Sequence, residues 1–297
     1  MNANLSTAEL RLVILLCNKG FTAGELAVAL KVKASFVSRL LSRLVQLNLV
    51  SVQKQGTRKI ISLSSASHAQ VFKKLYSSRP ALGVEKLFLG KAIEILIPLT
   101  GGELTYRELK SEINCSRSTF FKIKKRLGGV GALNEVNGKY SIPDPLVMEF
   151  ITQYADNLQI ILQKGLVGFT VSKRIGKHVL VKTESEKVPE YFVPTGMTRL
   201  VAEGLQIIGS GQQEYCFNLN EEARKIPIEE AFVHALALSS LQSRSEFILL
   251  GIFLKQSGST LNPILLRKAA KKYGVEKELA EIRRTLDLSE KLREYNA

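Results

Sequence analysis

The chain has 297 residues, of which 45% are hydrophobic and 23% charged, so it can bury several cores and is not a disordered or fibrous protein. Its longest apolar stretch, residues 247–254, is far shorter than the roughly 18 residues of a membrane span, and residues 1–20 lack the pattern of a signal peptide, so we expect a cytoplasmic protein. The net charge of +15 is uneven, with +10 in residues 1–81, +4 in 82–143 and +1 in 144–297. A basic first part joined to a neutral second part indicates that only the first meets a polyanion.

An internal repeat lies in the basic part, because residues 22–44 align without a gap onto residues 105–127. Each copy opens with a T-x-x-E capping box, in which a hydroxyl and a carboxylate satisfy backbone N–H groups at a helix start. The paired residues are Thr22 with Glu25 and Thr105 with Glu108. Each copy is therefore predicted to begin a helix at this threonine.

Two helices separated by about four residues are predicted in each copy. The first ends near Leu30 or Ile113, and the second starts at Ala34 or Arg117 with apolar residues at three- and four-residue spacing. An earlier amphipathic helix is expected at residues 8–17, behind a Ser6–Glu9 capping box, and at residues 86–96 in the second copy. Three helices are thus predicted per unit, with helix-turn-helix spacing in the last two.

A hairpin is predicted after each third helix. In the first unit residues 49–54 and 58–63 flank Gln55-Gly56-Thr57, and in the second residues 133–136 and 139–142 flank Asn137-Gly138, a strong signal for a tight turn. On this repeated capping box, helix spacing and hairpin, residues 5–143 resemble winged helix-turn-helix transcription regulators. Glycines at 128, 129 and 131 depart from the pattern and predict a shorter third helix and a smaller wing in the second unit.

The resemblance implies that the exposed face of the third helix and the wing contact DNA. Small hydroxyls and arginines suit the major groove, because serine can bond phosphates or base edges and arginine can bond guanine with two hydrogen bonds. In the first unit the candidate residues are Lys31, Lys33, Ser35, Ser38, Arg39, Ser42 and Arg43 near the helix, and Lys54, Thr57, Arg58 and Lys59 on the wing. The alternative is a solvated basic face without a ligand.

The second unit offers a similar outward set. Its candidates are Arg117, Ser118, Thr119, Lys122 and Lys125 on the helix, with Arg126 also expected to point outward, and Lys139 on the wing. Phe121 aligns with the expected exposed position of Ser38, so this unit is alternatively a packing or dimerisation module.

The neutral part is predicted to begin with an amphipathic helix, residues 144–164, which is either a connector or a dimer seam. Strands are then expected at residues 166–172, 178–183, 191–193 and 213–218, and helices at 195–205, 228–241, 245–256, 263–273 and 276–286. The fold class is therefore mainly α with α+β parts: winged helices at 1–81 and 82–143, the connecting helix, and an α+β domain at 165–297.

The order of strand, Val193-Pro194-Thr195-Gly196, helix, strand and the helix opening at Ile228 loosely resembles the C-terminal domain of AbiEi-type antitoxins. That resemblance implies a protein that binds a toxin with its C-terminal half and represses its own operon. Nearly balanced charge also predicts that this half binds a protein or a second copy, through the 144–164 helix or residues 228–256, unless both faces are buried.

Catalytic and metal motifs are not found in the sequence. His68, His178 and His234 are far apart, the three cysteines form no CxxC pair, and no Walker, GxSxG or HExxH element occurs. We therefore expect no enzyme activity, cofactor or metal. The leading hypothesis is a transcription regulator that binds double-stranded DNA, and the alternative is the antitoxin-like interaction protein.

Overall fold

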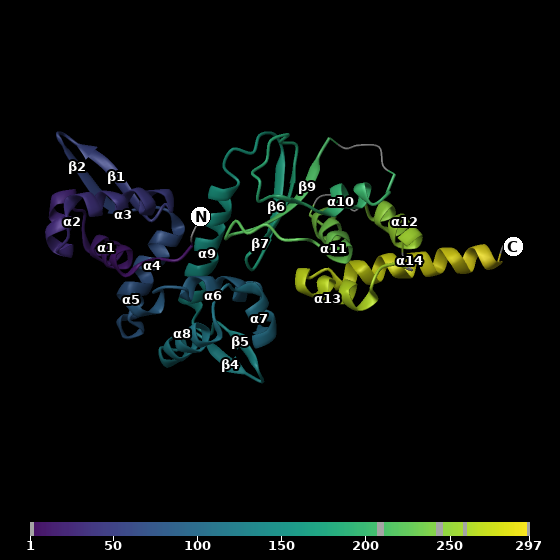
Figure 1. The fold of residues 1–297 in the computed structure, drawn as a ribbon, viewed down its shortest axis with the longest axis horizontal. Helices are drawn as coiled ribbons and strands as arrows, with labels where there is room; N and C mark the ends of the chain where they lie inside the picture. The colour runs from purple at the N-terminus through teal and green to yellow at the C-terminus, as the bar shows by residue number, and fades with distance from the viewer. Residues whose placement is uncertain (1–2, 207–210, 242–245, 258–259, 296–297) are drawn as a thin grey trace. The chain divides into compact units, whose positions relative to one another are not determined.

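The computed structural model describes residues 3–206, 211–241, 246–257 and 260–295 (Figure 1). The chain divides into two compact units, Met1–Gln163 and Lys164–Ala297. Both are mixed α+β, with helices packed on small antiparallel sheets.

The first repeat contains α1 (Thr7–Asn18), α2 (Ala23–Leu30), α3 (Ala34–Gln46) and the hairpin β1 (Val50–Gln55) with β2 (Arg58–Leu63). The capping boxes predicted for α1 and α2 are both formed: the serine or threonine hydroxyl accepts from the third helical N–H, and the glutamate accepts from the cap's own N–H. These local contacts fix where the two helices start.

The second repeat contains α5 (Val84–Leu87), α6 (Ala92–Leu99), β3 (Leu104–Thr105), α7 (Tyr106–Glu112), α8 (Arg117–Gly129) and the hairpin β4 (Asn134–Val136) with β5 (Lys139–Ser141). The single helix predicted at 86–96 is wrong. The helix is interrupted between α5 and α6, where Gly90 takes a left-handed conformation with φ +65° that does not continue a right-handed helix.

The predicted shortening of the second unit's third helix is also wrong, because α8 and α3 each have 13 residues. Gly128 and Gly129 remain helical. The turn after each helix uses aligned positions, Asn48 at φ 52° and Gly131 at φ 72°. Asparagine and glycine both tolerate this left-handed conformation, so each residue can end the third helix and start the turn that follows it. The smaller hairpin is confirmed, with three-residue strands in place of six.

A backbone pairing before the second helix of each repeat was not predicted. Phe21 pairs with Ile61 of β2, and the aligned Leu104 pairs with Tyr140 of β5, both antiparallel. The residue that leads into α2 or α7 is thereby tied to the second strand of the hairpin. This pairing fixes the hairpin against the helices in both copies.

Two further helices complete unit 1. Helix α4 (Ser67–Ser78) was not predicted, and it packs against α9 (Pro145–Leu162), whose N-terminus is capped by the Asp144 carboxylate. The apolar face of α9 is buried here: Phe150, Tyr154 and Leu158 are each 0% exposed, and the Phe150 ring contacts those of Phe72 and Phe88. This face is part of a core, so the expectation that it offers a protein-binding surface is wrong.

Unit 2 is built on an antiparallel sheet in the order β6-β7-β9-β8. Its strands are β6 (Thr170–Ile175), β7 (His178–Thr183), β8 (Val193–Pro194) and β9 (Gln213–Asn218). The predictions for β7 and β9 are confirmed. β6 begins four residues later than predicted, at Thr170, which pairs with Thr183 at the end of β7. The two strands are joined by the tight turn at Gly176-Lys177, where Ile175 is opposite His178.

The helices of unit 2 are α10 (Gly196–Ala202), α11 (Ile228–Ser239), α12 (Phe247–Ser257), α13 (Pro263–Tyr273) and α14 (Glu276–Tyr295). Helix α11 contacts α10, α12, α13 and the sheet, and nearly all its residues are buried (Figure 1). Helix α12 buries Leu250 and Phe253 but leaves Ile248 73% and Ile252 42% exposed. Among the helices that the structure describes, none has the length and apolar character needed to cross a bilayer.

Candidate nucleic-acid interface

Helix α3 has one buried and one exposed face. Val37, Leu40 and Leu44 are buried and fix the rotation of the helix on the first repeat's core. The opposite face is small and polar, with Ser35, Ser38, Arg39 and Ser42 exposed. Because these side chains share the solvent face at successive helical turns, they can approach one surface together.

The start of α3 combines positive side chains with open backbone donors. Lys31 lies in the left-handed region at φ 56° at the end of α2, Lys33 occupies the N-cap position of α3, and both are exposed. Among the described residues, no side chain forms a capping hydrogen bond at the first turn of α3. The first N–H groups of a helix and its dipole attract anions, so this end of α3 is suited to a phosphate.

Arg39 is positioned by a residue that the sequence reasoning missed. Its guanidinium lies 5.5 Å from the centroid of the half-buried Phe36 ring. An arginine over an aromatic face is held by a cation–π attraction while its N–H groups remain free to bind elsewhere. The three-residue spacing of Phe36 and Arg39 on a helix was the available signal.

The β1–β2 hairpin presents a second group of cations. Lys54 pairs in register with Lys59, and Gln55 pairs with Arg58 across the two-residue turn Gly56-Thr57. The three cations and Thr57 are all exposed. Within the part of the chain that the structure describes, no carboxylate comes within 4 Å of these cations or of Arg39, so none of them forms an ion pair there.

The structure corrects the orientation expected of Arg43. Its guanidinium turns toward α1, where Nη1 is 2.9 Å from an oxygen of the Glu9 carboxylate and Nη2 donates to the carbonyl of Asn4. Glu9 is only 2% exposed, so the ion pair balances a buried charge. Arg43 therefore fastens α3 to α1 and does not stand out along the open face.

The aligned Arg126 likewise fastens the third helix of the second repeat, α8, to an earlier segment of the chain. It too was expected to point outward, but its Nη2 donates to the carbonyl of Leu89 at 2.6 Å, and burial lowers the pKa of its guanidinium. The backbone of Leu89 itself pairs in parallel with that of Leu5. The identity of Arg43 and Arg126 in the repeat therefore reflects packing of the third helix.

The candidate residues on α8 are more engaged with the protein than those on α3. Ser116 caps the helix by accepting from the N–H of Thr119 at 3.2 Å, and its hydroxyl also lies 3.0 Å from that of Ser118. Arg117, Lys122 and Lys125 remain exposed. The polar start of α8 is thus used within the helix cap.

Carboxylates also reduce the positive charge of the second repeat. Lys139 lies 4.0 Å from Glu103, and Lys124 is 2.5 Å from Glu135. Phe121, at the position aligned with Ser38, is 39% exposed and packs on Tyr106 and Phe120. The exposed surface of the second repeat is therefore partly aromatic, and part of its positive charge is paired with carboxylates.

Each repeat brings its own candidates together, but the two sets remain separate. In Figure 1 the β1–β2 and β4–β5 hairpins project from unit 1 in opposite directions. The structure thus offers two faces, of which the first is the more basic.

Unit 2 holds two buried polar networks. Arg224 donates twice to Glu230, at 2.6 and 2.8 Å, and Tyr273 donates to the same carboxylate at 2.7 Å. His234 is fully buried, with Nδ1 2.7 Å from the hydroxyl of Thr195, and burial lowers the pKa of its imidazole. These bonds join α11 to α13, to α10's start and to the loop before α11.

A second network surrounds Glu214 on β9. Its carboxylate accepts from the N–H of Met197 at 2.6 Å and lies 3.5 Å from the ammonium of the buried Lys182. Burial raises the pKa of Glu214 to about 7. A Cβ at Gly196 would come 1.9 Å from this carboxylate, so glycine is required where the chain enters α10.

The residues that the structure describes include no group of three or more histidine, cysteine, aspartate or glutamate side chains placed to hold a metal ion, and the three cysteines are buried and unpaired with one another. No protein-family model matches the chain, and no curated protein sequence matches it.

Proposed function

We propose that this protein is a sequence-specific double-stranded DNA-binding transcription regulator that reads DNA with the first repeat, as a winged helix-turn-helix protein does. One observation carries the proposal: α3 and the β1–β2 hairpin present exposed hydroxyls and cations that lack carboxylate partners within the described chain. Affinity for duplex DNA comes largely from cations that displace the counterions of phosphates.

The parts have separate roles in this proposal. Helix α3 enters the major groove with Ser35, Ser38, Arg39 and Ser42, while Lys31 and Lys33 meet a phosphate at its start. The wing residues Lys54, Arg58 and Lys59 contact the backbone of the duplex. The second repeat, with its capped and partly neutralised face, contributes less affinity.

The test is a selection of bound duplexes from random DNA by the full-length protein, followed by titration of the selected and random duplexes at several salt concentrations. We expect an enriched motif and an affinity that falls linearly with salt on logarithmic axes. For variants that remove a single cation from α3 or the wing, the matched control is Lys74→Ala, which removes one positive charge from the exposed face of α4 in unit 1. No enriched motif, or equal affinity for all duplexes, would contradict the proposal.

Removal of residues 1–81 is a poor test, although the charge distribution suggests it. Asn157 of α9 donates to the carbonyl of Leu47 at 2.9 Å, and Tyr154 donates to that of Ala3 at 3.0 Å. Such a truncation exposes the core shared by both repeats, so single-residue variants are preferable.

The exposed apolar residues of α12 form a candidate surface for a protein partner of unit 2. Ile248 and Ile252 lie one turn apart on α12 and are exposed, whereas the α9 face proposed from the sequence is buried. If α12 binds a second copy or another protein, Ile248→Lys will lower the mass of the full-length complex in solution. An unchanged mass with Ile248→Lys would remove α12 from that role.

A further inference from the structure

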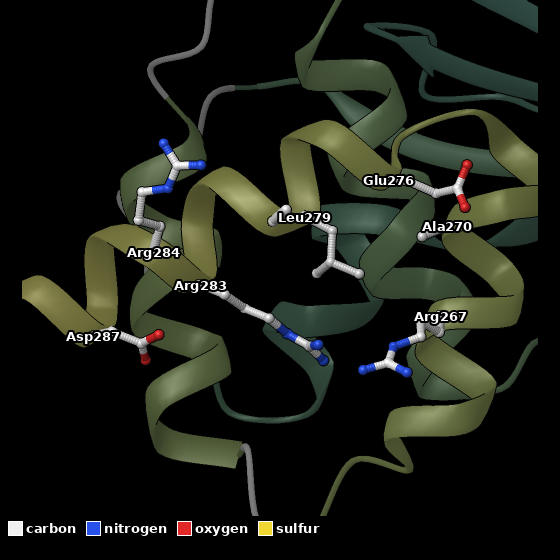
Figure 2. A pocket seen from close by; sticks show the side chains of 8 residues that line it. Arg267, Ala270, Glu276, Leu279, Arg283, Arg284 and Asp287 are labelled. Carbon is white, nitrogen blue, oxygen red and sulfur yellow. The ribbon is translucent and has the colours of Figure 1, made fainter.

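A hollow of about 490 Å³ lies between α13 and α14 in unit 2 (Figure 2). Leu279 and the small side chains of Ala270 and Ala280 form its apolar part. The charged residues that line it are Arg267, Arg283, Arg284, Glu276 and Asp287.

Two guanidinium groups from different helices face this hollow. Figure 2 shows Arg267 of α13 and Arg283 of α14 directed toward the same space, while Arg284 and Glu276 point away from it. Neither Arg267 nor Arg283 has a carboxylate within 4 Å among the residues placed by the structure. Glu276 and Asp287 also line the hollow, but neither forms an ion pair with Arg267 or Arg283 among the described residues, so the two guanidiniums repel each other and an anion between them lowers this cost.

We propose that this hollow binds a small organic phosphate monoester, of about the size of a nucleoside monophosphate. A phosphate monoester carries a charge near −2 and three acceptor oxygens, which two planar guanidiniums can bind from two sides with paired hydrogen bonds. The apolar lining offers a contact for the organic part, and the volume lies within the roughly 300–1,000 Å³ range of small-molecule sites. The site is independent of the DNA-binding face.

The experiment is calorimetric titration of the full-length protein with adenosine monophosphate and, separately, with inorganic phosphate. We expect saturable binding of the nucleotide that is at least tenfold tighter than that of phosphate, because only the nucleotide uses the apolar lining. Arg267→Gln and Arg283→Gln should each weaken nucleotide binding at least tenfold. Lys268→Gln is the matched control, because Lys268 lies next to Arg267 on α13, is exposed and does not line the hollow, so this variant should bind as the parent does.

Lysine variants keep the test decisive if a glutamine variant does not fold. Arg283→Lys retains the charge but loses the paired hydrogen bonds, so a folded Arg283→Lys protein should still bind several-fold more weakly. The proposal is overturned if neither probe binds at millimolar concentration, if both bind equally well, or if the arginine variants bind the nucleotide unchanged. A loss of duplex DNA affinity in the arginine variants would also overturn it, because the two arginines would then belong to the DNA site.

Discussion

The two repeats of unit 1 share their framework and differ in what they expose. Both have a capping box before the second helix, a 13-residue third helix and an arginine that holds this helix to the preceding segment. Among the described residues, no side chain caps α3, and Arg39 and the three cations of the first wing have no carboxylate within 4 Å. In the second repeat Ser116 caps α8, and Glu135 and Glu103 lie beside Lys124 and Lys139. The two repeats therefore share one backbone framework but expose different surfaces, and we expect the first to have the higher affinity for a polyanion.

The largest effect concerns the shared framework. Arg43→Ala should lower the free energy of unfolding by about 3 kcal/mol, because it leaves the buried Glu9 carboxylate without its counter-charge. The aligned Arg126→Ala should cost about 1 kcal/mol, since it removes a hydrogen bond to a carbonyl and leaves no buried charge. Urea denaturation measures both.

A second substitution checks the cause of the Arg43 effect. Glu9→Gln in the Arg43→Ala background should recover part of the lost stability, because a neutral amide is cheaper to bury than a carboxylate. Equal stability of Arg43→Ala and the parent protein would mean that the ion pair has no role in fastening α3.

The wings should differ in DNA affinity. Combined Lys54→Ala, Arg58→Ala and Lys59→Ala should weaken binding to every duplex on the order of 100-fold at 0.15 M salt, because about three phosphate contacts are lost. The salt dependence of the affinity should become less steep by about three ion equivalents. Fluorescence anisotropy with selected and random duplexes measures both quantities.

The matched triple variant in the second repeat is Lys122→Ala, Lys125→Ala and Lys139→Ala. We expect a loss below about tenfold, since Glu103 already offsets one of these charges. A loss as large as that of the first repeat would show that the two faces bind DNA equally.

Base reading is expected from Arg39 but not from its aligned residue, Lys122. Arg39→Ala should reduce the preference for the selected duplex over random DNA by about 1–3 kcal/mol, whereas Lys122→Ala should leave this preference nearly unchanged. Competition titrations with both duplexes give the difference directly. Equal losses of Arg39→Ala on selected and random DNA would remove Arg39 from the base-reading role.

The smallest effect is a pH dependence through His68 of α4, which contacts the end of the first repeat's third helix. His68 lies within 3.1 Å of the Leu47 carbonyl at the end of α3, and burial lowers the pKa of its imidazole. The unfolded chain then binds more protons as the pH falls below about 6.5, so acidification from pH 7 to 5 should cost up to about 1 kcal/mol of stability through this residue. His68→Gln should lessen this loss. The second repeat should show no matching dependence, because it has no histidine.

The interactions near in sequence were predictable because they depend on neighbouring residues alone. Three capping boxes, the Asn137-Gly138 turn and the starts of α3 and α8 follow from local hydrogen bonds and backbone preferences. The uneven charge likewise located the candidate DNA face without a structure. The break at Gly90 and the full length of α8 were mispredicted, because single glycines are compatible with both outcomes.

What only the tertiary structure decided involves partners far apart in the chain. Arg43 was expected on the open face of α3 because helical spacing places it there, yet Glu9, 34 residues earlier, draws it inward. The face of α9 was expected to be a binding surface, yet α4, a helix that the sequence pattern did not reveal, covers it. The facing pair Arg267 and Arg283 also requires two helices to pack. Sequence alone determined which side chains are charged or apolar, and packing decided which of them remain exposed to meet a ligand.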